Sequence, residues 1–294
     1  MEIIFDGMVP AEWSESDVQD LILKRPGCNP PSISVKPISQ VYDARVSQEM
    51  VKDEAEMFEE CGFALTRHET NCMPWQAEQH SEVYRNACNE YINELEAIVS
   101  QRLLPGAKLE LFRADPMLRR GLGSQFDYTR GVHQDVGASI PDYVQNLKTI
   151  YSKEIADAWQ ARYAKADVLN YIVINFWRTT EMVGPLRHMP LAICDPKSII
   201  RDDILSVSLP GATVGGERVD QTALRYNPDQ RWYYYPGITS DEVIAFKLFE
   251  ARKSDEDAQI RSCFHAAFND PTAASDVEPR RSCEQRIGFF CISD

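Results

Sequence analysis

The chain has 294 residues, which suits one large domain or two smaller ones, and 44% of them are hydrophobic while 26% are charged. Lysine and arginine number 31 and aspartate and glutamate 45, so the net charge of −14 excludes nucleic acid as the main partner. No apolar run approaches the roughly 18 residues of a membrane-spanning helix, so the composition indicates a soluble globular protein with no membrane partner.

The N-terminal segment is predicted to be extended. Residues 1–45 contain Pro26, Pro30, Pro31 and Pro37, with turn-forming residues between them. We expect this segment to wrap over the protein as part of the same domain without a core of its own, and residues 46–294 to form that single domain. The first residues lack the basic and apolar pattern of a secretory signal, which predicts a cytoplasmic location.

Two helices are predicted before the main β region. Residues 47–60 begin with a serine suited to cap a helix, have apolar residues at helical spacing and end before Gly62. A short strand at 63–65 follows. Residues 76–103 are flanked by prolines and carry one apolar face, which is typical of a longer helix packed on a core.

The rest of the chain has the pattern of strands around one helical insertion. Alternating side chains predict a strand at 108–113, and a β-branched run predicts a central strand at 171–176. A second long helix is predicted between them at 142–166. Such short and frequent strands favour a barrel or a sandwich. Further short strands are predicted at 191–193, 232–235, 243–248, 263–268 and 286–292.

Two of the five histidines stand in strand patterns that predict a metal site. His133 and Asp135 are two residues apart, and side chains at this spacing on a strand point to the same face. His265 lies in a later apolar strand pattern and completes a set of two histidines and one carboxylate. This donor set is typical of non-haem Fe(II), which keeps three positions open. The spacing alone is a weak signal, since a histidine in an apolar strand is more often structural.

A basic cluster after His265 strengthens this hypothesis. Residues 279–286, with the sequence PRRSCEQR, lead into the last apolar strand. An iron oxygenase that uses 2-oxoglutarate needs a fixed cation for the distal carboxylate of this co-substrate, and arginine holds a carboxylate through two parallel hydrogen bonds. The alternative interpretation of the cluster is a solvated, charged turn before an edge strand.

The order and spacing of these motifs resemble a known family. Over residues 60–292 the chain is similar to the fungal and bacterial hydroxylase/desaturase family that includes the gibberellin desaturase. The resemblance implies an Fe(II)- and 2-oxoglutarate-dependent oxygenase with His133, Asp135 and His265 as metal ligands. It also implies a mainly β fold, in which a double-stranded β-helix (jelly-roll, cupin-like) core carries N-terminal helices and the inserted long helix. The blocks that carry it are GVHQD at 131–135, NFWR at 175–178, PLAICD at 190–195, WYYYP at 232–236, DEV at 241–243, HAAF at 265–268 and RSCEQR at 281–286.

Which arginine binds 2-oxoglutarate stays open at this stage. In an unbroken last strand, Arg286 and Ser282 share one face, while Arg281, Ile287 and Phe289 share the other. Many oxygenases of this class place the arginine at the start of the last strand, which suits Arg286. An inward face with Ile287 and Phe289 would suit Arg281 instead. Both arginines and Ser282 are therefore candidate co-substrate contacts, and the two apolar residues are candidate substrate contacts.

Two further substrate contacts are proposed at a predicted strand end. Asn175 can bond a ligand oxygen and Arg178 can pair with a substrate carboxylate, although both could instead bond the backbone around a packed Trp177. We expect oxidation of an unactivated C–H bond, with Fe(II), 2-oxoglutarate and O2, in a small carboxylate-bearing metabolite such as an amino acid or a terpenoid acid. Hydroxylation, desaturation and oxidative ring closure, all reactions of secondary metabolism, stay open.

Two rival functions and the oligomeric state also stay open. An iron enzyme of the same fold that does not use 2-oxoglutarate would keep the three ligands but not need the arginines. In a non-enzymatic barrel that binds a small molecule, the histidines would be structural. The eight cysteines include no pair at the spacing of a zinc cage or redox dithiol, which predicts reduced and mostly buried thiols.

Overall fold

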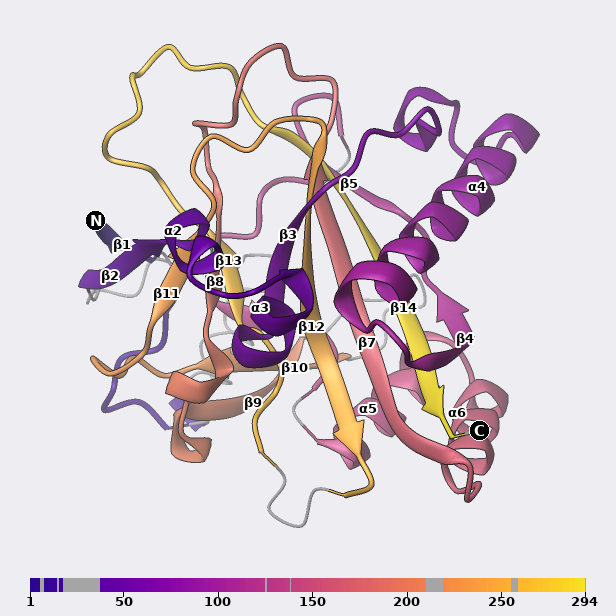
Figure 1. Ribbon diagram of the computed structural model, residues 1–294. Coiled ribbons are helices and arrows are strands. Elements are labelled where there is room, and N and C mark those ends of the chain that lie inside the picture. Colours follow the sequence, from indigo (N-terminus) through magenta and orange to yellow (C-terminus); the bar gives the residue numbers. More distant parts are fainter. Residues whose placement is uncertain are drawn as a thin grey trace.

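The computed structural model describes residues 1–5, 8–14, 16–17, 38–124, 126–137, 139–209, 219–254 and 259–293. The four prolines of the predicted N-terminal wrap lie outside these ranges. Two β-sheets form the body of the protein, helices lie on the outside, and the two termini are on opposite sides (Figure 1). In the part of the chain that is described, no helix is long and apolar enough to cross a membrane.

The first sheet is built around two long antiparallel strands, β7 (Val168–Thr179) and β14 (Arg281–Ile292). β12 (Glu242–Arg252) pairs with the other edge of β7, and β3 (Phe63–Arg67) pairs with β12. Two strands share the remaining edge of β14. The first half of β14 pairs with one of them and the second half with the other. They are β5 (Leu118–Gly121) and β4 (Lys108–Ala114).

The second sheet consists of eight short strands and carries both predicted histidine ligands. β13 (His265–Ala267) lies between β8 (Leu191–Cys194) and β6 (His133–Gln134), so His265 is the direct Cα partner of His133. The sheet continues on both sides of these three strands. The other members are β1 (Glu2–Ile4), β2 (Ile38–Asp43), β11 (Trp232–Tyr234), β9 (Ile204–Leu209) and β10 (Val219–Leu224).

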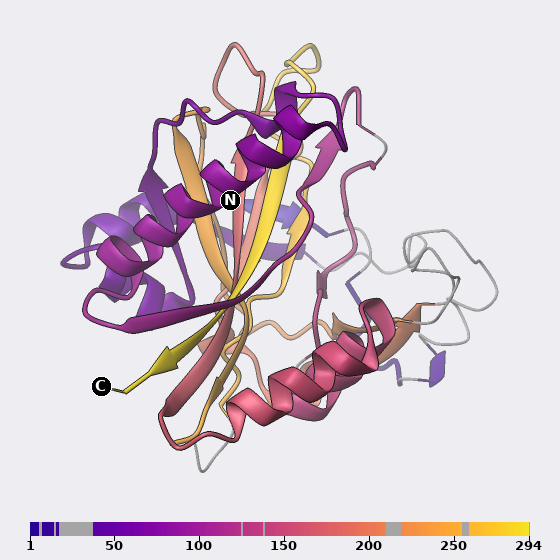
Figure 2. The ribbon, with the colours of Figure 1, turned by 90° about the vertical axis from the view of Figure 1, so that its right-hand side faces the viewer.

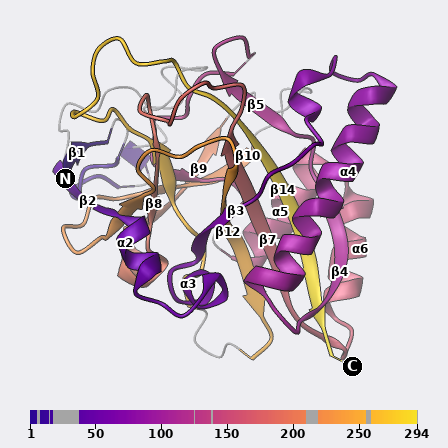
Figure 3. The same cartoon turned by 45° about the horizontal axis from the view of Figure 1, so that its top comes forward.

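The longest helix, α4 (Glu82–Ile98), lies across the six-stranded sheet and runs into a π-helical turn (Val99–Leu103) (Figures 2 and 3). Its Tyr91 and Leu95 are fully buried in the main core, as its apolar pattern predicted. The other helices are α2 (Ala44–Glu49), α3 (Glu54–Cys61), α5 (Ile140–Ile150) and α6 (Lys153–Tyr163), with 3-10 turns at Pro74–Gln76, Pro196–Ser198 and Arg201–Asp203.

Two segments that were each predicted as one continuous helix are divided into two helices in the structure. The segment 47–60 contains the end of α2 and most of α3, because Asp53 accepts a hydrogen bond from the Glu56 amide and starts a new helix. The inserted segment 142–166 is likewise two helices, because the Ser152 hydroxyl caps α6 through the Ile155 amide. A side chain that caps a new helix ends the preceding one, although the apolar spacing runs on through the break.

The described part of the N-terminal segment contributes side chains to a hydrophobic core that it shares with the rest of the chain. Ile3, Phe5 and Met8 are buried in a second hydrophobic cluster behind the eight-stranded sheet. The Phe5 ring lies 4.3 Å from that of Trp232 on β11. Because β1 pairs with β2 and β2 with β11, the start of the chain completes the sheet that carries the histidines.

Candidate metal centre

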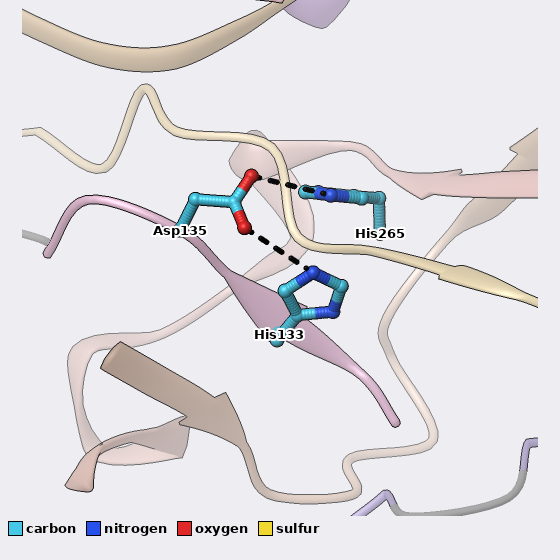
Figure 4. A group of neighbouring side chains, drawn as sticks. All are labelled: His133, Asp135 and His265. Atoms are coloured by element: carbon cyan, nitrogen blue, oxygen red, sulfur yellow. Dashed lines mark ion pairs between the residues drawn. The ribbon is translucent and has the colours of Figure 1, made fainter. Parts of the chain in front are cut away.

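His133, Asp135 and His265 converge on one point, as the sequence predicted (Figure 4). His133 begins β6, Asp135 follows the end of β6, and His265 begins the neighbouring strand β13. One ligand atom from each lies within 4.8 Å of the other two. His133 Nε2 is 3.4 Å from Asp135 Oδ1, and His265 Nε2 is 3.7 Å from Asp135 Oδ2. Pairing of the two short strands therefore builds the cluster.

Backbone carbonyls set the orientation of both imidazoles. His133 Nδ1 lies 2.8 Å from the carbonyl oxygen of Gly131, and His265 Nδ1 lies 3.3 Å from that of Cys263. A carbonyl oxygen only accepts, so each Nδ1 carries the proton and donates it. Each Nε2 then turns an unprotonated lone pair towards Asp135, which is the tautomer that a metal ligand needs.

Burial and one arginine fix the charges of the cluster. Burial alone would raise the pKa of Asp135, but the Arg286 guanidinium, 3.2 Å away, and the His133 imidazole hold it well below its usual range. Burial, together with the neighbouring His133, lowers the pKa of His265 to about 4. At neutral pH the cluster therefore offers a carboxylate anion beside a neutral His265 imidazole, which is suited to a divalent cation.

The donor set and the spacing fit a first-row metal ion. Bonds of about 2.1 Å at right angles place neighbouring ligand atoms about 3 Å apart, slightly closer than the 3.4 and 3.7 Å from Asp135 to the two histidines. Asp135 Oδ2 is buried, and apart from the ion pair with Arg286 it has no hydrogen bond of good geometry among the described residues. A buried carboxylate oxygen with incomplete hydrogen bonding is costly, and a bound cation would satisfy it. Two imidazoles and one carboxylate suit Fe(II) with open positions.

A narrow cavity extends from the two histidines to the start of β14. Arg280, at its far end, is 2% exposed, and its guanidinium carbon lies 4.3 Å from the centre of the Tyr128 ring. Its Nη1 donates to the Met189 carbonyl, but its Nε and the Ser282 Oγ are buried without hydrogen-bond partners among the described residues. The cavity is lined by Arg120, Thr129, His133, Trp177, Leu191, His265, Ala267, Arg280 and Glu284.

The structure shows which face of β14 is turned towards the cluster. Arg286 and Glu284 point to it, since Arg286 Nη2 contacts Asp135 and Glu284 lines the cavity. Arg281 points away, and its Nη1 donates to the carbonyl oxygen of Glu181, 2.9 Å away near the surface. Ile287 and Phe289 are fully buried in the main core on the Arg281 side of the strand. The alternative in which these two residues share an inward face with Arg281 is therefore wrong.

Asn175 and Arg178, the two candidate substrate contacts on β7, lie on opposite faces of the sheet. Asn175 lies opposite Arg286 in the sheet, and its Nδ2 donates to Glu284 Oε2 over 3.2 Å. Arg178 is on the other face, where it donates to the carbonyl oxygens of His68 and Ser240 and lies against the Trp75 ring. The structure thus brings Asn175 to the cluster, whereas Arg178 lies in a different cavity, outside the sheet.

The position of Arg280 in the cavity and the pair of Glu284 and Arg120, whose Oε1 and Nε are 3.0 Å apart, were not predicted from the sequence. Arg280 and Ser282 are two residues apart, so the sequence already indicated that they share a strand face. This indication could not be used without knowing which face pointed inward. The partner of Glu284 carried no signal, because Arg120 belongs to β5, which the sequence did not predict.

Three comparisons place the chain among known proteins. A family model described as an oxidoreductase/YMDC permease-like domain matches residues 29–290. The hydroxylase/desaturase efuI of Hormonema carpetanum is 33% identical over 126 residues, 40% of each chain. The Fe(II)/2-oxoglutarate-dependent dioxygenase nvfI of Aspergillus novofumigatus is 31% identical over 119 residues, 40% of this chain and 39% of its own. The chain thus matches only about two fifths of the length of these relatives.

One solved structure extends the likeness to the whole fold. The iron and alpha-ketoglutarate-dependent endoperoxidase NvfI superposes with a TM-score of 0.65 over 99% of this chain and 97% of its own, at 18% sequence identity. At this identity the likeness concerns the fold. It confirms the predicted mainly β architecture of the cupin-like, double-stranded β-helix type with flanking helices.

Proposed function

Because the chain belongs to the oxidoreductase/YMDC permease-like domain family, we propose that it is an Fe(II)- and 2-oxoglutarate-dependent oxygenase of secondary metabolism. The observation that carries this proposal is the cavity that joins the cluster of His133, Asp135 and His265 to the buried Arg280. A barrel that only bound a metal would have no need for a buried guanidinium in the same cavity, because a buried charge without a partner is costly.

His133, Asp135 and His265 hold the metal in this proposal. The bound Fe(II), together with 2-oxoglutarate and O2, supplies the oxidising power that breaks an unactivated C–H bond. The protein fixes the ligand geometry. The two carbonyl-bound Nδ1–H groups hold the imidazoles, and the Arg286 guanidinium holds the Asp135 carboxylate in its ionised form.

Arg280 and Ser282 bind the distal carboxylate of 2-oxoglutarate. A carboxylate at this end of the cavity would accept hydrogen bonds from the buried Arg280 Nε and Ser282 Oγ, which otherwise have no partners among the described residues. The Trp177 ring beside Arg280, with Leu191 and Ala267, keeps water out, which strengthens this ion pair. This assignment replaces Arg281 and Arg286 as the co-substrate anchor and keeps Ser282.

A hydrogen-bonded group behind the cavity keeps its inner wall rigid. Glu284 accepts from Asn175 and from Arg120, and its Oε1 lies 3.3 Å from Arg286 Nη2. Burial raises the pKa of Glu284, but Arg286 and Arg120 lower it overall, so it stays an anion. Asn175 acts here as a positioning residue, since its amide donates to Glu284 and does not line the cavity.

The target is a small molecule, and hydroxylation, desaturation and ring closure all fit the same centre. Names of the relatives include a hydroxylase/desaturase and a dioxygenase, which supports an oxidation. The substrate carboxylate predicted from the sequence, as in an amino acid or a terpenoid acid, requires a cation that is not already used by 2-oxoglutarate. Arg286, beside Asp135, is such a cation.

Anaerobic titration of Fe(II) and 2-oxoglutarate tests this function through the weak visible charge-transfer band of the chelate. We expect the band in the wild-type protein and none in His133→Ala. In Arg280→Met the 2-oxoglutarate affinity should fall by about ten- to a hundredfold, because a charged hydrogen bond in a buried site contributes about 1.5–3 kcal/mol. Arg281→Met is the matched control and should bind 2-oxoglutarate like the wild type.

The two rival functions give different results in the same titration. A wild-type protein that binds Fe(II) without any band would be an iron enzyme that does not use 2-oxoglutarate. Failure to bind iron would leave the non-enzymatic barrel as the better explanation. Equal 2-oxoglutarate affinities in Arg280→Met and Arg281→Met would show that the anchor has been misassigned.

A further inference from the structure

Arg280, the residue before β14, and Arg286, within it, are turned to the same side and reach the metal cluster at different places. Arg280 lines the cavity that contains His133 and His265, whereas Arg286 contacts Asp135 directly. Six residues of extended strand, at about 3.3 Å each, separate their Cα atoms by about 20 Å. A single 2-oxoglutarate that chelates the metal with one end can reach only one of these guanidinium groups with the other. Arg286 is therefore available for another anion.

The guanidinium of Arg286 is only partly engaged within the protein. Its contacts to Asp135 Oδ2, at 3.2 Å, and Glu284 Oε1, at 3.3 Å, both use Nη2. Its Nε is buried and has no hydrogen-bond partner among the described residues. An arginine can donate five hydrogen bonds in a planar fork, so a carboxylate could bind Arg286 without displacing Asp135.

The charges around the cluster leave room for one more anion. Three arginines, Arg120, Arg280 and Arg286, face two buried carboxylates, Asp135 and Glu284. The more exposed Asp115 and Asp127 add weaker attractions to Arg286 and Arg280. The two positive charges of Fe(II) and the two negative charges of 2-oxoglutarate cancel. Among these close contacts one positive charge then stays without a paired carboxylate, and such a charge is costly where water is largely excluded. A substrate with a single carboxylate would neutralise it.

A second cavity begins at Arg286 and is largely apolar. Val136, which follows the ligand Asp135, forms one wall, and Tyr143 and Leu147 of α5 form another. Gly288, the next residue of β14 on the same face as Arg286, lines this cavity together with Val173 and Tyr171 of β7. The remaining arginine of this cavity, Arg113, is neutralised by Asp115 at 2.6 Å. Arg286 is thus the charged end of a mainly apolar pocket.

We propose that Arg286 binds the carboxylate of the substrate and that the cavity under α5 holds the apolar part of the molecule. The substrate is then a small monocarboxylic acid, bound next to the Asp135 side of the metal, while 2-oxoglutarate lies on the Arg280 side. This inference rests on the proposed function for the assignment of Arg280 to 2-oxoglutarate. The inserted helices α5 and α6 thereby contribute to substrate recognition.

Binding of simple acids and their neutral amides tests this inference without knowledge of the natural substrate. Protein loaded with Zn(II) and 2-oxoglutarate is titrated with butyrate and hexanoate, and with butyramide and hexanamide, by ligand-observed NMR. In the wild type we expect each acid to bind at least tenfold more tightly than its amide. We also expect hexanoate to bind more tightly than butyrate, because it covers more of the apolar wall.

The variants separate a substrate anchor from a residue that only supports the metal. Arg286→Met should lose the preference for acids and should lose clearly less 2-oxoglutarate affinity than Arg280→Met does. Arg286→Lys, which keeps a positive charge beside Asp135, should retain part of the preference, and Arg281→Met all of it. Zn(II) content is measured for each variant, so that loss of the metal is detected directly.

Three results would overturn the inference. These are equal binding of acids and amides by the wild type, an unchanged preference in Arg286→Met, and a loss of 2-oxoglutarate binding in Arg286→Met as large as in Arg280→Met. Loss of Zn(II) in both Arg286 variants with an unchanged preference would make Arg286 a positioning residue for Asp135 instead. A wild-type protein without the charge-transfer band but with the preference for acids would refute the proposed function and leave the anion site standing.

Discussion

Replacement of Phe5 by alanine should destabilise the protein strongly, although Phe5 lies far from the metal ligands in the sequence. Its side chain is fully buried between the rings of Trp232, at 4.3 Å, and Phe268, at 6.5 Å. Truncation of a buried phenylalanine costs about 3–5 kcal/mol, because transfer energy and packing are lost together. At about 2.1 cal/mol/K of unfolding entropy per residue, this corresponds to a decrease in Tm of roughly 5–8 °C for 294 residues.

The same change should also weaken the metal site. The cluster that contains Phe5 includes Val132 and Ala266, which are the neighbours of His133 and His265 in the sequence. Looser packing behind these strands allows the two imidazoles to move, and metal affinity depends on their fixed orientation. We therefore expect a weaker affinity for Fe(II) in Phe5→Ala under conditions in which the variant is still folded.

Urea unfolding followed by circular dichroism and an Fe(II) titration measure these two effects. Met50→Ala is the control, because Met50 is 82% exposed and its truncation should change stability by less than about 0.5 kcal/mol. A loss of less than about 1 kcal/mol in Phe5→Ala would refute the placement of the first residues in this core. A large loss of stability with unchanged metal affinity would refute the link between the core and the ligands.

Two further predictions concern packing and pH. Gly288→Ala should lower the free energy of unfolding by about 1–3 kcal/mol, because a Cβ there would overlap the Tyr171 hydroxyl. The loss should be smaller in a Tyr171→Phe background. Equal losses in both backgrounds, measured by urea unfolding, would argue against this contact. Burial by itself would raise the pKa of Glu59, but Arg252 and Lys247 lower it to about 2. Since the pKa is depressed on folding, Glu59 stabilises the protein fully above its ordinary value of about 4.5, and this contribution is lost as the pH falls towards 2. The stability difference between wild type and Glu59→Gln should therefore shrink between pH 6 and pH 3, and a constant difference would contradict the ion pairs of Glu59.

The sequence predicted most of the strands and helices, because their signals are local. The β-branched run in β7 and the apolar face of α4 are set by periodicity within each segment. The breaks at Asp53 and Ser152 were missed, since a cap ends a helix without changing the apolar spacing around it. β1, β2, β5, β9 and β10 were also missed, because these short strands depend on their partners more than on their own residues.

The three metal-ligand candidates could be named from the sequence, but their convergence is a tertiary fact. Spacing in the chain relates His133 to Asp135, and the strand pairing of β6 with β13 brings His265 to them. Periodicity likewise divided β14 into two faces without indicating which one pointed inward. Only the packing of Ile287 and Phe289 in the main core turned Arg280, Ser282 and Arg286 towards the metal. The sequence by itself thus determined the chemistry available on each strand, and the tertiary structure decided which groups meet, because burial of the larger apolar face sets the direction of the other.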